Sequence, residues 1–534
     1  MSKLTCVNNF SENAFRDKRL FYRCNKILRD CLDNPNGSIP EISKDYHQSK
    51  AVYRFLDNDN VKWKNLLKDW SKQLAKMIIN SRERILVAQD TTSLDFTSKP
   101  KTKNLGYLEM KNLYGIKSHS ALAITKAGEP LGLLSQINWV RDISEYGKKK
   151  DSNKKPIEEK ESYIWLKTFK NLQELGLENF VLIGDRESDL FDLFNLERKE
   201  RQHILVRSRF NRRIKFKSKN INVDTETNTN TNTNTKTETE TNTKTNTETN
   251  TNNKLKLWDS LDSKTKYNLN IEVPRSRKQN TRIAKCKLSF GESTIIQQSL
   301  NIKTKNLKTN EVELKKVKQA GEVKLSLVTL EEKDCPKGDT PILWRLITTL
   351  PVSNKEQAKE IINFYKQRWL VEEFYYTLKS GCQVEELHLK EKENILNMLM
   401  IYNLVSCKIL NLCYLARIEP NKKATKNAFS LQELQVLYNY HKVKNPRLVV
   451  LSDDDNNNNN KSEKSENQYK TYPPNIDNPS TIPNIHTAII QVAKLGGFLA
   501  RKNDGLPGVK TIWRGLRKLA IMEEYHEMIF VGKG

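Results

Sequence analysis

The chain has 534 residues, with 91 Lys and Arg against 64 Asp and Glu and a formal net charge of +27. This length exceeds what one hydrophobic core serves and predicts two to four modules. So basic a balance is typical of proteins that bind a polyanion, although a lysine-rich genome would produce it too. We recognise no signal peptide, membrane-spanning run or CxxC pair, since the best apolar stretch, 396–416, contains Asn and Lys; we therefore expect an intracellular protein with eight reduced cysteines.

The first half of the chain changes from a helical to an alternating pattern. Residues 1–80 carry apolar residues at three-to-four spacing among many Lys and Arg, which predicts a small basic helical domain. Short apolar runs follow and predict four strands and a helix, at 85–88, 119–124, 131–139 and 180–184, with the helix at 157–175. A second, amphipathic helix is expected after residue 189. This order indicates an α/β fold with a mixed sheet covered by helices.

The second half begins with a strand-rich stretch from 203 to 352, which is predicted to be a mostly β module inserted into the core. Two low-complexity segments, 225–253 and 452–468, are too polar to offset their ordering entropy and are predicted to be disordered. A long helix is expected from Ser353, which would form a capping box with Glu356. Later helices are expected at 391–417, 430–441 and 484–530, the last broken at 496–497 and 505–508.

Three acids are candidates for chemistry. Asp90 and Asp185 each end a predicted strand, and Glu372 lies on the predicted long helix. Rigid strand ends hold carboxylates well at a sheet edge, and two aspartates with a glutamate can bind two Mg²⁺ ions for phosphoryl transfer. A strand-end aspartate also commonly just caps a turn. Other acids close by compete on spacing alone: Asp95, Glu187, Asp189 and Glu373.

The surroundings of Glu372 strengthen its candidacy. On a straight helix at about 100° per residue, Tyr365, Arg368, Glu372 and Lys379 fall within one narrow stripe. An aromatic, two cations and a carboxylate suit a metal ligand flanked by phosphate contacts. A solvated face with an Arg368–Glu372 pair is the alternative.

The spacing Tyr365-x2-Arg368-x3-Glu372-x6-Lys379 resembles the Y-R-E-K signature of the insertion-sequence-four family of DDE transposases, especially those of the Tn-five type. Five further motifs resemble the same family in the same order. They are 51–61 with Tyr53-Arg54-Phe55, Asp90-Thr91-Thr92-Ser93-Leu94, 159–166, Asp185-Arg186-Glu187-Ser188-Asp189 and Leu495-Gly496-Gly497-Phe498. The two low-complexity segments depart from the family pattern.

The resemblance implies an RNase H-like core with an inserted mostly β module, between N-terminal and C-terminal helical domains. The expected division is a DNA-binding domain at 1–80, catalytic core at 81–209 and 344–390, β insertion at 210–343, and a dimerisation region at 391–534. It further implies that Asp90, Asp185 and Glu372 hold two Mg²⁺ ions, with Mn²⁺ as a substitute. One strand would be cut at the transposon end, the freed 3′-OH would form a hairpin, and the reopened end would join target DNA.

The same resemblance implies which residues and partners serve DNA. Tyr365, Arg368 and Lys379 would grip phosphates, Trp344 would stack a flipped base, and Arg207 and Arg209 would contact DNA. The partners would be double-stranded DNA at the transposon ends and target and a second copy of the chain, with no membrane. The protein would be DNA-associated, in the cytoplasm of a prokaryote or the nucleus of a eukaryote.

Two other functions remain open on the sequence. An inactive or repurposed DNA-binding descendant of a transposase would keep the fold and charge without turnover. A repair-type nuclease would share the metal site, but it explains the Tyr-Arg-Glu-Lys spacing less well.

Overall fold

The computed structural model describes residues 9–530 except 44, 148–155, 216–255, 262–263, 274–280, 306–311, 425–427, 445–473, 476 and 502–503. The segments predicted to be disordered, 225–253 and 452–468, lie outside the described residues. Contacts divide the chain into two compact units. Unit 1 comprises 1–207, 303–314 and 359–534, and unit 2 comprises 208–302 and 315–358.

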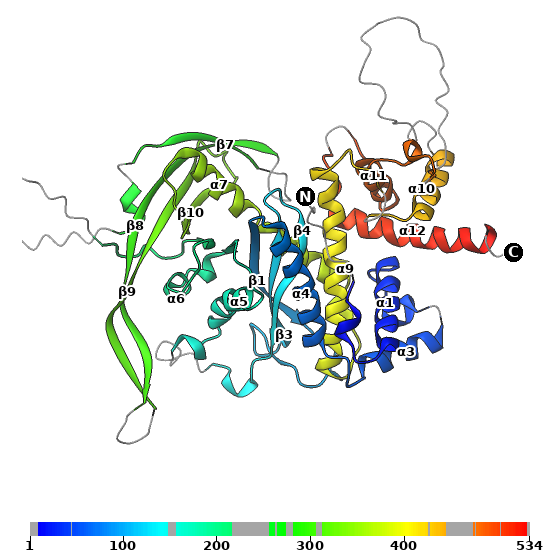
Figure 1. The fold of residues 1–534 in the computed structure, drawn as a ribbon, viewed down its shortest axis with the longest axis horizontal. Coiled ribbons are helices and arrows are strands. Elements are labelled where there is room, and N and C mark those ends of the chain that lie inside the picture. The colour runs from blue at the N-terminus through cyan, green and yellow to red at the C-terminus, as the bar shows by residue number, and fades with distance from the viewer. Residues whose placement is uncertain are drawn as a thin grey trace, which may run out of the picture. The chain divides into compact units, whose positions relative to one another are not determined.

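The centre of unit 1 is a mixed sheet (Figure 1). Its strands run in the order β4-β3-β1-β5-β6, and the short β2 also pairs with β3. Strands β4, β3 and β1 are antiparallel, whereas β1, β5 and β6 are parallel. The bounds are β1 Ile85–Asp95, β2 Gly106–Tyr107, β3 Tyr114–Ile124, β4 Pro130–Trp139, β5 Phe180–Gly184 and β6 Gln202–Arg207. Three antiparallel strands followed by two parallel ones form the expected RNase H-like α/β core.

The sheet's burial explains why its sequence reads as short apolar runs. All five residues of β5 are buried, as a parallel strand covered on both faces requires. Helices α4 (Trp63–Ser81) and α5 (Tyr163–Glu174) both pack against β4. The helix predicted at 157–175 begins later than expected, because residues 157–159 form only a 3-10 turn. The helix expected after residue 189 is a single turn, α6 (Phe191–Phe194).

Helices make up the ends of unit 1. The N-terminal ones before α4 are α1 (Lys18–Asp33), α2 (Ile39–Ile42) and α3 (Tyr46–Leu56). The C-terminal ones are α9 (Lys392–Ile418), α10 (Leu431–Lys444), α11 (Ile485–Leu495) and α12 (Val509–Phe530). The helices predicted at 391–417, 430–441 and 484–530 are confirmed, except that the described residues between α11 and α12 form one connection without a helix instead of two separate breaks. The seven cysteines in the described residues are free thiols.

The long helix α9 is apolar enough to pass a composition test for a membrane span, but most of it is buried inside the protein. The asparagines that interrupt its apolar pattern have buried partners. Asn397 donates to the carbonyls of Leu56 and Val61 and accepts from the amide of Trp63, the first residue of α4. Asn397 therefore fixes how α9 packs against the N-terminal helices, since it satisfies backbone groups that burial would otherwise leave unpaired. Asn403 and Asn411 instead bond to β4 and to the turn before it.

Unit 2 contains the predicted β module. Its strands run in the order β7-β8-β9-β10, with bounds Tyr267–Val273, Arg282–Lys305, Val312–Lys333 and Leu343–Thr348. Strands β8 and β9 are the longest of the described strands, with 24 and 22 residues. The ion pairs of Arg282 with Glu332 and Asp339 join β8 to β9 and to the segment before β10.

The long helix predicted from Ser353 is broken and starts one residue later. The side chain of Asn354, not Ser353, accepts from the amide of Gln357, so the capping residue is Asn354. The helix is divided into α7 (Lys355–Lys366), α8 (Trp369–Tyr376) and a π-helical turn at Thr377–Gly381. The prediction that Tyr365 and Lys379 lie on one face of a single straight helix is therefore wrong.

Candidate functional site

The β1–β5 register brings two of the predicted acids together. Ile85 to Ala88 pair in parallel with Phe180 to Ile183. Carried two residues further, the same register places Asp90 level with Asp185. The expectation that Asp90 ends its strand is wrong, because β1 continues to Asp95 by pairing with β3 alone. Asp90 instead lies just beyond the last β1–β5 pair, where the sheet edge opens beside Asp185.

Asp185 is held by the turn that follows β5. Its side chain accepts from the amide of Glu187 at 2.8 Å, and the Ser188 hydroxyl donates to its carbonyl at 2.7 Å. This turn requires glycine at 184, because a Cβ there would lie 2.7 Å from the Cβ of Ser188. The carboxylate does cap a turn, as the simpler interpretation proposed, and the capping also fixes its direction.

Arg368 links the third acid to the first. It lies in the break between α7 and α8, donates to Glu372 one turn later, and has its Nη1 3.8 Å from Oδ2 of Asp90. Its side chain is only 15% exposed. The guanidinium thus supplies positive charge to two carboxylates that come from β1 and α8.

The electrostatics of Asp90 show that the three acids influence one another. Burial raises the pKa of Asp90 to about 7, and the charges of Asp185 and Glu372 raise it as well. The amide of Thr91 and the guanidinium of Arg368 oppose this shift. A carboxyl crowded by two others is an arrangement that a bound cation would relieve.

Tyr365 and Arg207 join the same group of side chains within unit 1. The guanidinium of Arg368 lies 6.0 Å from the ring centre of Tyr365, which is buried. Arg207, the last residue of β6, interacts with the Tyr365 hydroxyl, and burial lowers the pKa of its guanidinium. Burial raises the pKa of Tyr365, which Arg368 and Arg207 oppose. Two cations therefore gather about one phenol beside the acids.

Lys379 occupies the π-helical turn after α8 and is held by two partners. Its Nζ donates to the carbonyl of Ser93 on β1 and lies 3.0 Å from Oε1 of Glu385. The same Glu385 oxygen accepts from the amide of Asp95 at 2.9 Å. Lys379 therefore ties the glutamate-bearing segment to the far end of β1. Glu385 was missed by sequence reasoning, because its spacing carries no signal before the fold is known.

Trp344 and Arg209 belong to unit 2. Trp344 is half-buried on β10, opposite Leu330 of β9. Arg209 is exposed, and its guanidinium lies 5.4 Å from the ring centre of Phe210, which Arg212 also approaches at 5.2 Å. The two residues predicted to contact DNA therefore lie in unit 2, whereas the three acids lie in unit 1.

The competing acids have other surroundings. Glu373 accepts from the Tyr414 hydroxyl at 2.9 Å, Asp95 accepts from Thr97, and Glu187 is exposed. In the described part of the chain, no three His, Cys, Asp or Glu side chains are close enough to hold one metal ion. The side chains of Asp90, Asp185 and Glu372 still fit a hard divalent cation, because such cations prefer carboxylate oxygens. A positive charge, the guanidinium of Arg368, already lies between Asp90 and Glu372.

Three family models match the chain. Residues 6–61 match the family described as transposase DNA-binding, 164–407 match the transposase DDE domain, and 467–529 match the transposase Tn5 dimerisation domain. Asp185 and Glu372 fall inside the second match, whereas Asp90 falls between the first and second. Its place in the site is therefore supported by the strand register.

The chain is also similar, at 11% identity and a TM-score of 0.29, to the piggyBac transposase in a synaptic complex with hairpin DNA. The match covers 74% of this chain and 65% of that one.

Proposed function

We propose that this chain, which belongs to the DDE transposases similar to the Tn5 enzyme, binds the ends of a transposon, cuts the DNA there and joins the ends to a target. The observation that carries this proposal is that the β1–β5 register brings Asp90 level with Asp185, while Arg368 links Asp90 to Glu372.

The acidic residues would bind the cations, and the basic residues would bind the DNA phosphates. Asp90, Asp185 and Glu372 would hold two Mg²⁺ ions, which supply charge neutralisation to the attacking and leaving oxygens. Arg368, Arg207 and Lys379 would bind phosphates, because guanidinium and ammonium groups pair with them strongly. Tyr365 would orient both arginines, since its ring and hydroxyl lie against them. When DNA and cations bind, Arg368 would move from the carboxylates to a phosphate.

The finer course of the reaction follows from the same family. The first cut would free a 3′-OH that attacks the opposite strand and forms a hairpin, which is then reopened before the joining step. Trp344 would stack a base flipped out at that hairpin, and Arg209 would contact the backbone of the DNA. Two copies would hold two ends together, a proposal supported by the dimerisation match over 467–529.

The test compares the three candidate metal ligands with three acids that lie close to them in the sequence. Asp90→Asn, Asp185→Asn and Glu372→Gln should each lower cleavage of a labelled transposon-end duplex in Mg²⁺ by at least about a thousandfold, because each removes a cation ligand. Asp95→Asn, Glu187→Gln and Glu373→Gln are the matched controls and should stay within about threefold of the unchanged protein. All six should bind the duplex with similar affinity, measured by fluorescence anisotropy.

Two outcomes would redirect the proposal. If Asp185→Asn still cut DNA while Glu187→Gln did not, the second acid would be misassigned. If the unchanged protein bound the duplex but cut nothing in Mg²⁺ or Mn²⁺, the chain would be a DNA-binding descendant without turnover.

A further inference from the structure

Tyr375 connects the helix of Glu372 to the backbone of Asp90. It follows Glu372 by three residues on α8, and its side chain is buried. Its hydroxyl donates to the carbonyl of Asp90 at 2.7 Å and accepts from the amide of Ser120 at 2.9 Å. The carbonyl of Ser118 lies 3.3 Å from the same hydroxyl.

The strand register makes this contact unusual. Asp90 and Ser120 are directly opposite each other in the antiparallel β1–β3 pair. The amide of one and the carbonyl of the other are groups that a strand ladder joins directly. Here a phenol oxygen from α8 bonds to both. The position of α8 and the local spacing of β1 and β3 are thereby set by one hydroxyl at the residue that carries the first acid.

The residues on either side of Asp90 are fastened from the β3 side. His119 Nδ1 lies 2.7 Å from the hydroxyl of Thr91, and its Nε2 lies 3.1 Å from Oε1 of Gln89. Burial lowers the pKa of His119 to about 3, so the ring is neutral and donates through one nitrogen while accepting through the other. The backbone at Asp90 is thus already rigid toward β3, and Tyr375 couples this rigid segment to the glutamate helix.

We propose that Tyr375 is a positioning residue that sets the distance between the carboxylates of Asp90 and Glu372. The proposal rests on the proposed function, because that spacing matters where both acids hold the same cations. A phenol suits the task, since its rigid ring has few rotamers and its hydroxyl can donate and accept at once. Without the hydroxyl, the carbonyl of Asp90 and the amide of Ser120 would each lose a hydrogen-bond partner, and α8 would lose its bond to β1.

The test compares two phenols whose hydroxyls each connect α8 to a neighbouring element. Tyr375→Phe removes the bonds to Asp90 of β1 and Ser120 of β3, whereas Tyr414→Phe removes the bond from α9 to Glu373, the neighbour of Glu372. The first readout is Mn²⁺ binding without DNA, counted by electron paramagnetic resonance of the free ion. The second is single-turnover cleavage of a transposon-end duplex across a range of Mg²⁺ concentrations, with thermal midpoints measured in parallel.

Tyr375→Phe should weaken Mn²⁺ binding and lower the cleavage rate at least about tenfold, because small misplacements of reacting groups are costly. High Mg²⁺ should recover part of that rate, and Tyr414→Phe should match the unchanged protein in both readouts. Equal losses in both variants would mean that α8 is merely loosened, and a lower thermal midpoint with unchanged Mn²⁺ binding would mean a structural role; either overturns the inference.

The two proposals fail separately. If the unchanged protein binds Mn²⁺ but cuts no DNA, the proposed function fails, and weaker Mn²⁺ binding in Tyr375→Phe still supports the positioning role. If the unchanged protein cuts DNA and Tyr375→Phe does so equally well, only the positioning role fails. A protein that neither binds Mn²⁺ nor cuts would refute both.

Discussion

Arg368 has two partners that a divalent cation would also seek. Its guanidinium contacts Glu372 and lies 3.8 Å from Asp90, so it opposes the burial and the repulsion between acids that raise the pKa of Asp90. An incoming cation must therefore compete with a charge that the protein already provides. This competition predicts that the free protein gains less stability from metal than three carboxylates alone would give.

Arg368→Gln should therefore enlarge the response to metal. In EDTA the variant should unfold at a lower temperature than the unchanged protein, because Asp90 and Glu372 lose a counter-charge. Adding Mn²⁺ should then raise its midpoint by more than it raises that of the unchanged protein, since binding of a ligand to the folded state stabilises it. Differential scanning fluorimetry with and without Mn²⁺ measures both shifts, and Lys366→Gln, an exposed position on α7, is the control. Equal Mn²⁺ shifts in all three proteins would contradict this account.

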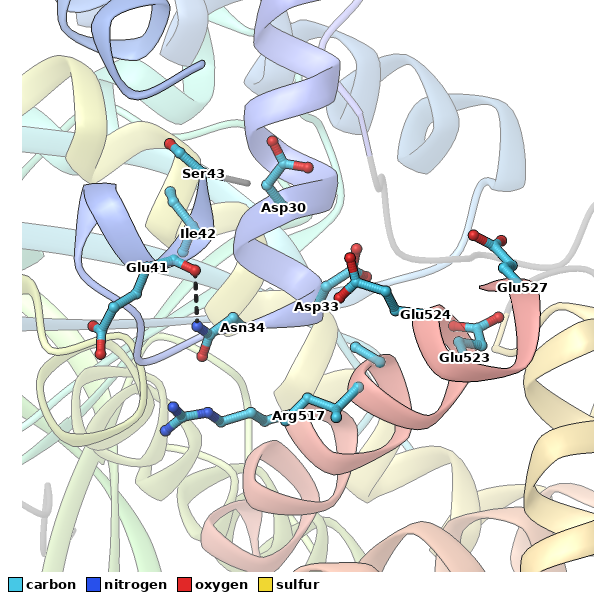
Figure 2. Close-up of a pocket in the computed structure, with 12 residues that line it drawn as sticks. Asp30, Asp33, Asn34, Glu41, Ile42, Ser43, Arg517, Glu523, Glu524 and Glu527 are labelled. Atoms are coloured by element: carbon cyan, nitrogen blue, oxygen red, sulfur yellow. Dashed lines mark hydrogen bonds between the residues drawn. The ribbon is translucent and has the colours of Figure 1, made fainter. Parts of the chain in front are cut away.

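At the scale of elements, α1 and α12 meet through acidic side chains. Figure 2 shows Asp30 and Asp33 of α1 near Glu523, Glu524 and Glu527 of α12, around a pocket that Arg517 also lines. Burial raises the pKa of Glu523 to about 7, and the charges of Glu433 on α10, Asp33 and Glu527 raise it as well. Burial raises the pKa of Asp33 to about 6, with the charges of Asp30 and Glu433 adding to the shift and those of Arg29 and Lys408 opposing it.

The contact between these helices should therefore be pH-dependent. A carboxyl whose pKa is raised by folding contributes stability below its ordinary pKa near 4.5, and that stability is lost as the pH rises through about 7. Glu523→Gln keeps the neutral form at every pH. It should raise the thermal midpoint by about 2 °C at pH 8 and by much less at pH 5.

Thermal midpoints of Glu523→Gln and of the control Glu524→Gln, an exposed neighbour, measure this directly. A gain for Glu523→Gln that is equal at pH 5 and pH 8 would rule out titration of this carboxyl as its cause.

At the scale of the whole molecule, α12 has an apolar stripe facing solvent. Ile521, Tyr525 and Met528 are 60%, 66% and 67% exposed and recur at helical spacing. The same helix packs inward through Trp513, whose ring centre lies 5.7 Å from that of Tyr376 on α8. Because the stripe lies within the dimerisation match, we propose that it faces a second copy of the chain.

The double variant Tyr525→Ser/Met528→Ser should prevent two copies from assembling on transposon-end DNA, because it removes the apolar surface that pairing would bury. Glu527→Ser, about 100° around the helix from Met528, is the matched control. Multi-angle light scattering of the DNA complex gives the number of chains. A double variant that still carries two chains per complex would place the dimer contact elsewhere.

The order of most helices and strands, and the residue types of the candidate site, could be predicted from the sequence. The burial of β5 on both faces forces a continuous apolar run, and the carboxylates and cations of the site stand at recognisable spacings. Asp90, Asp185 and Glu372 could therefore be named as candidate ligands before the fold was known. The asparagines of α9 were also visible, but as interruptions of an apolar helix, because their partners, near the α3–α4 connection and on β4, are distant in the chain.

Which of these residues lie next to one another depends on the tertiary structure and could not be predicted from the sequence. The β1–β5 register, which aligns Asp90 with Asp185, depends on pairing between segments 95 residues apart. The break at Arg368 and the π-helical turn at Lys379 depart from a straight helix, and the two side chains there contact Glu372, Ser93 and Glu385. Tyr375 resembles any apolar helix residue in sequence, and its role at Asp90 arises because packing places its hydroxyl between two strands. Such long-range contacts leave no local pattern for a sequence to display.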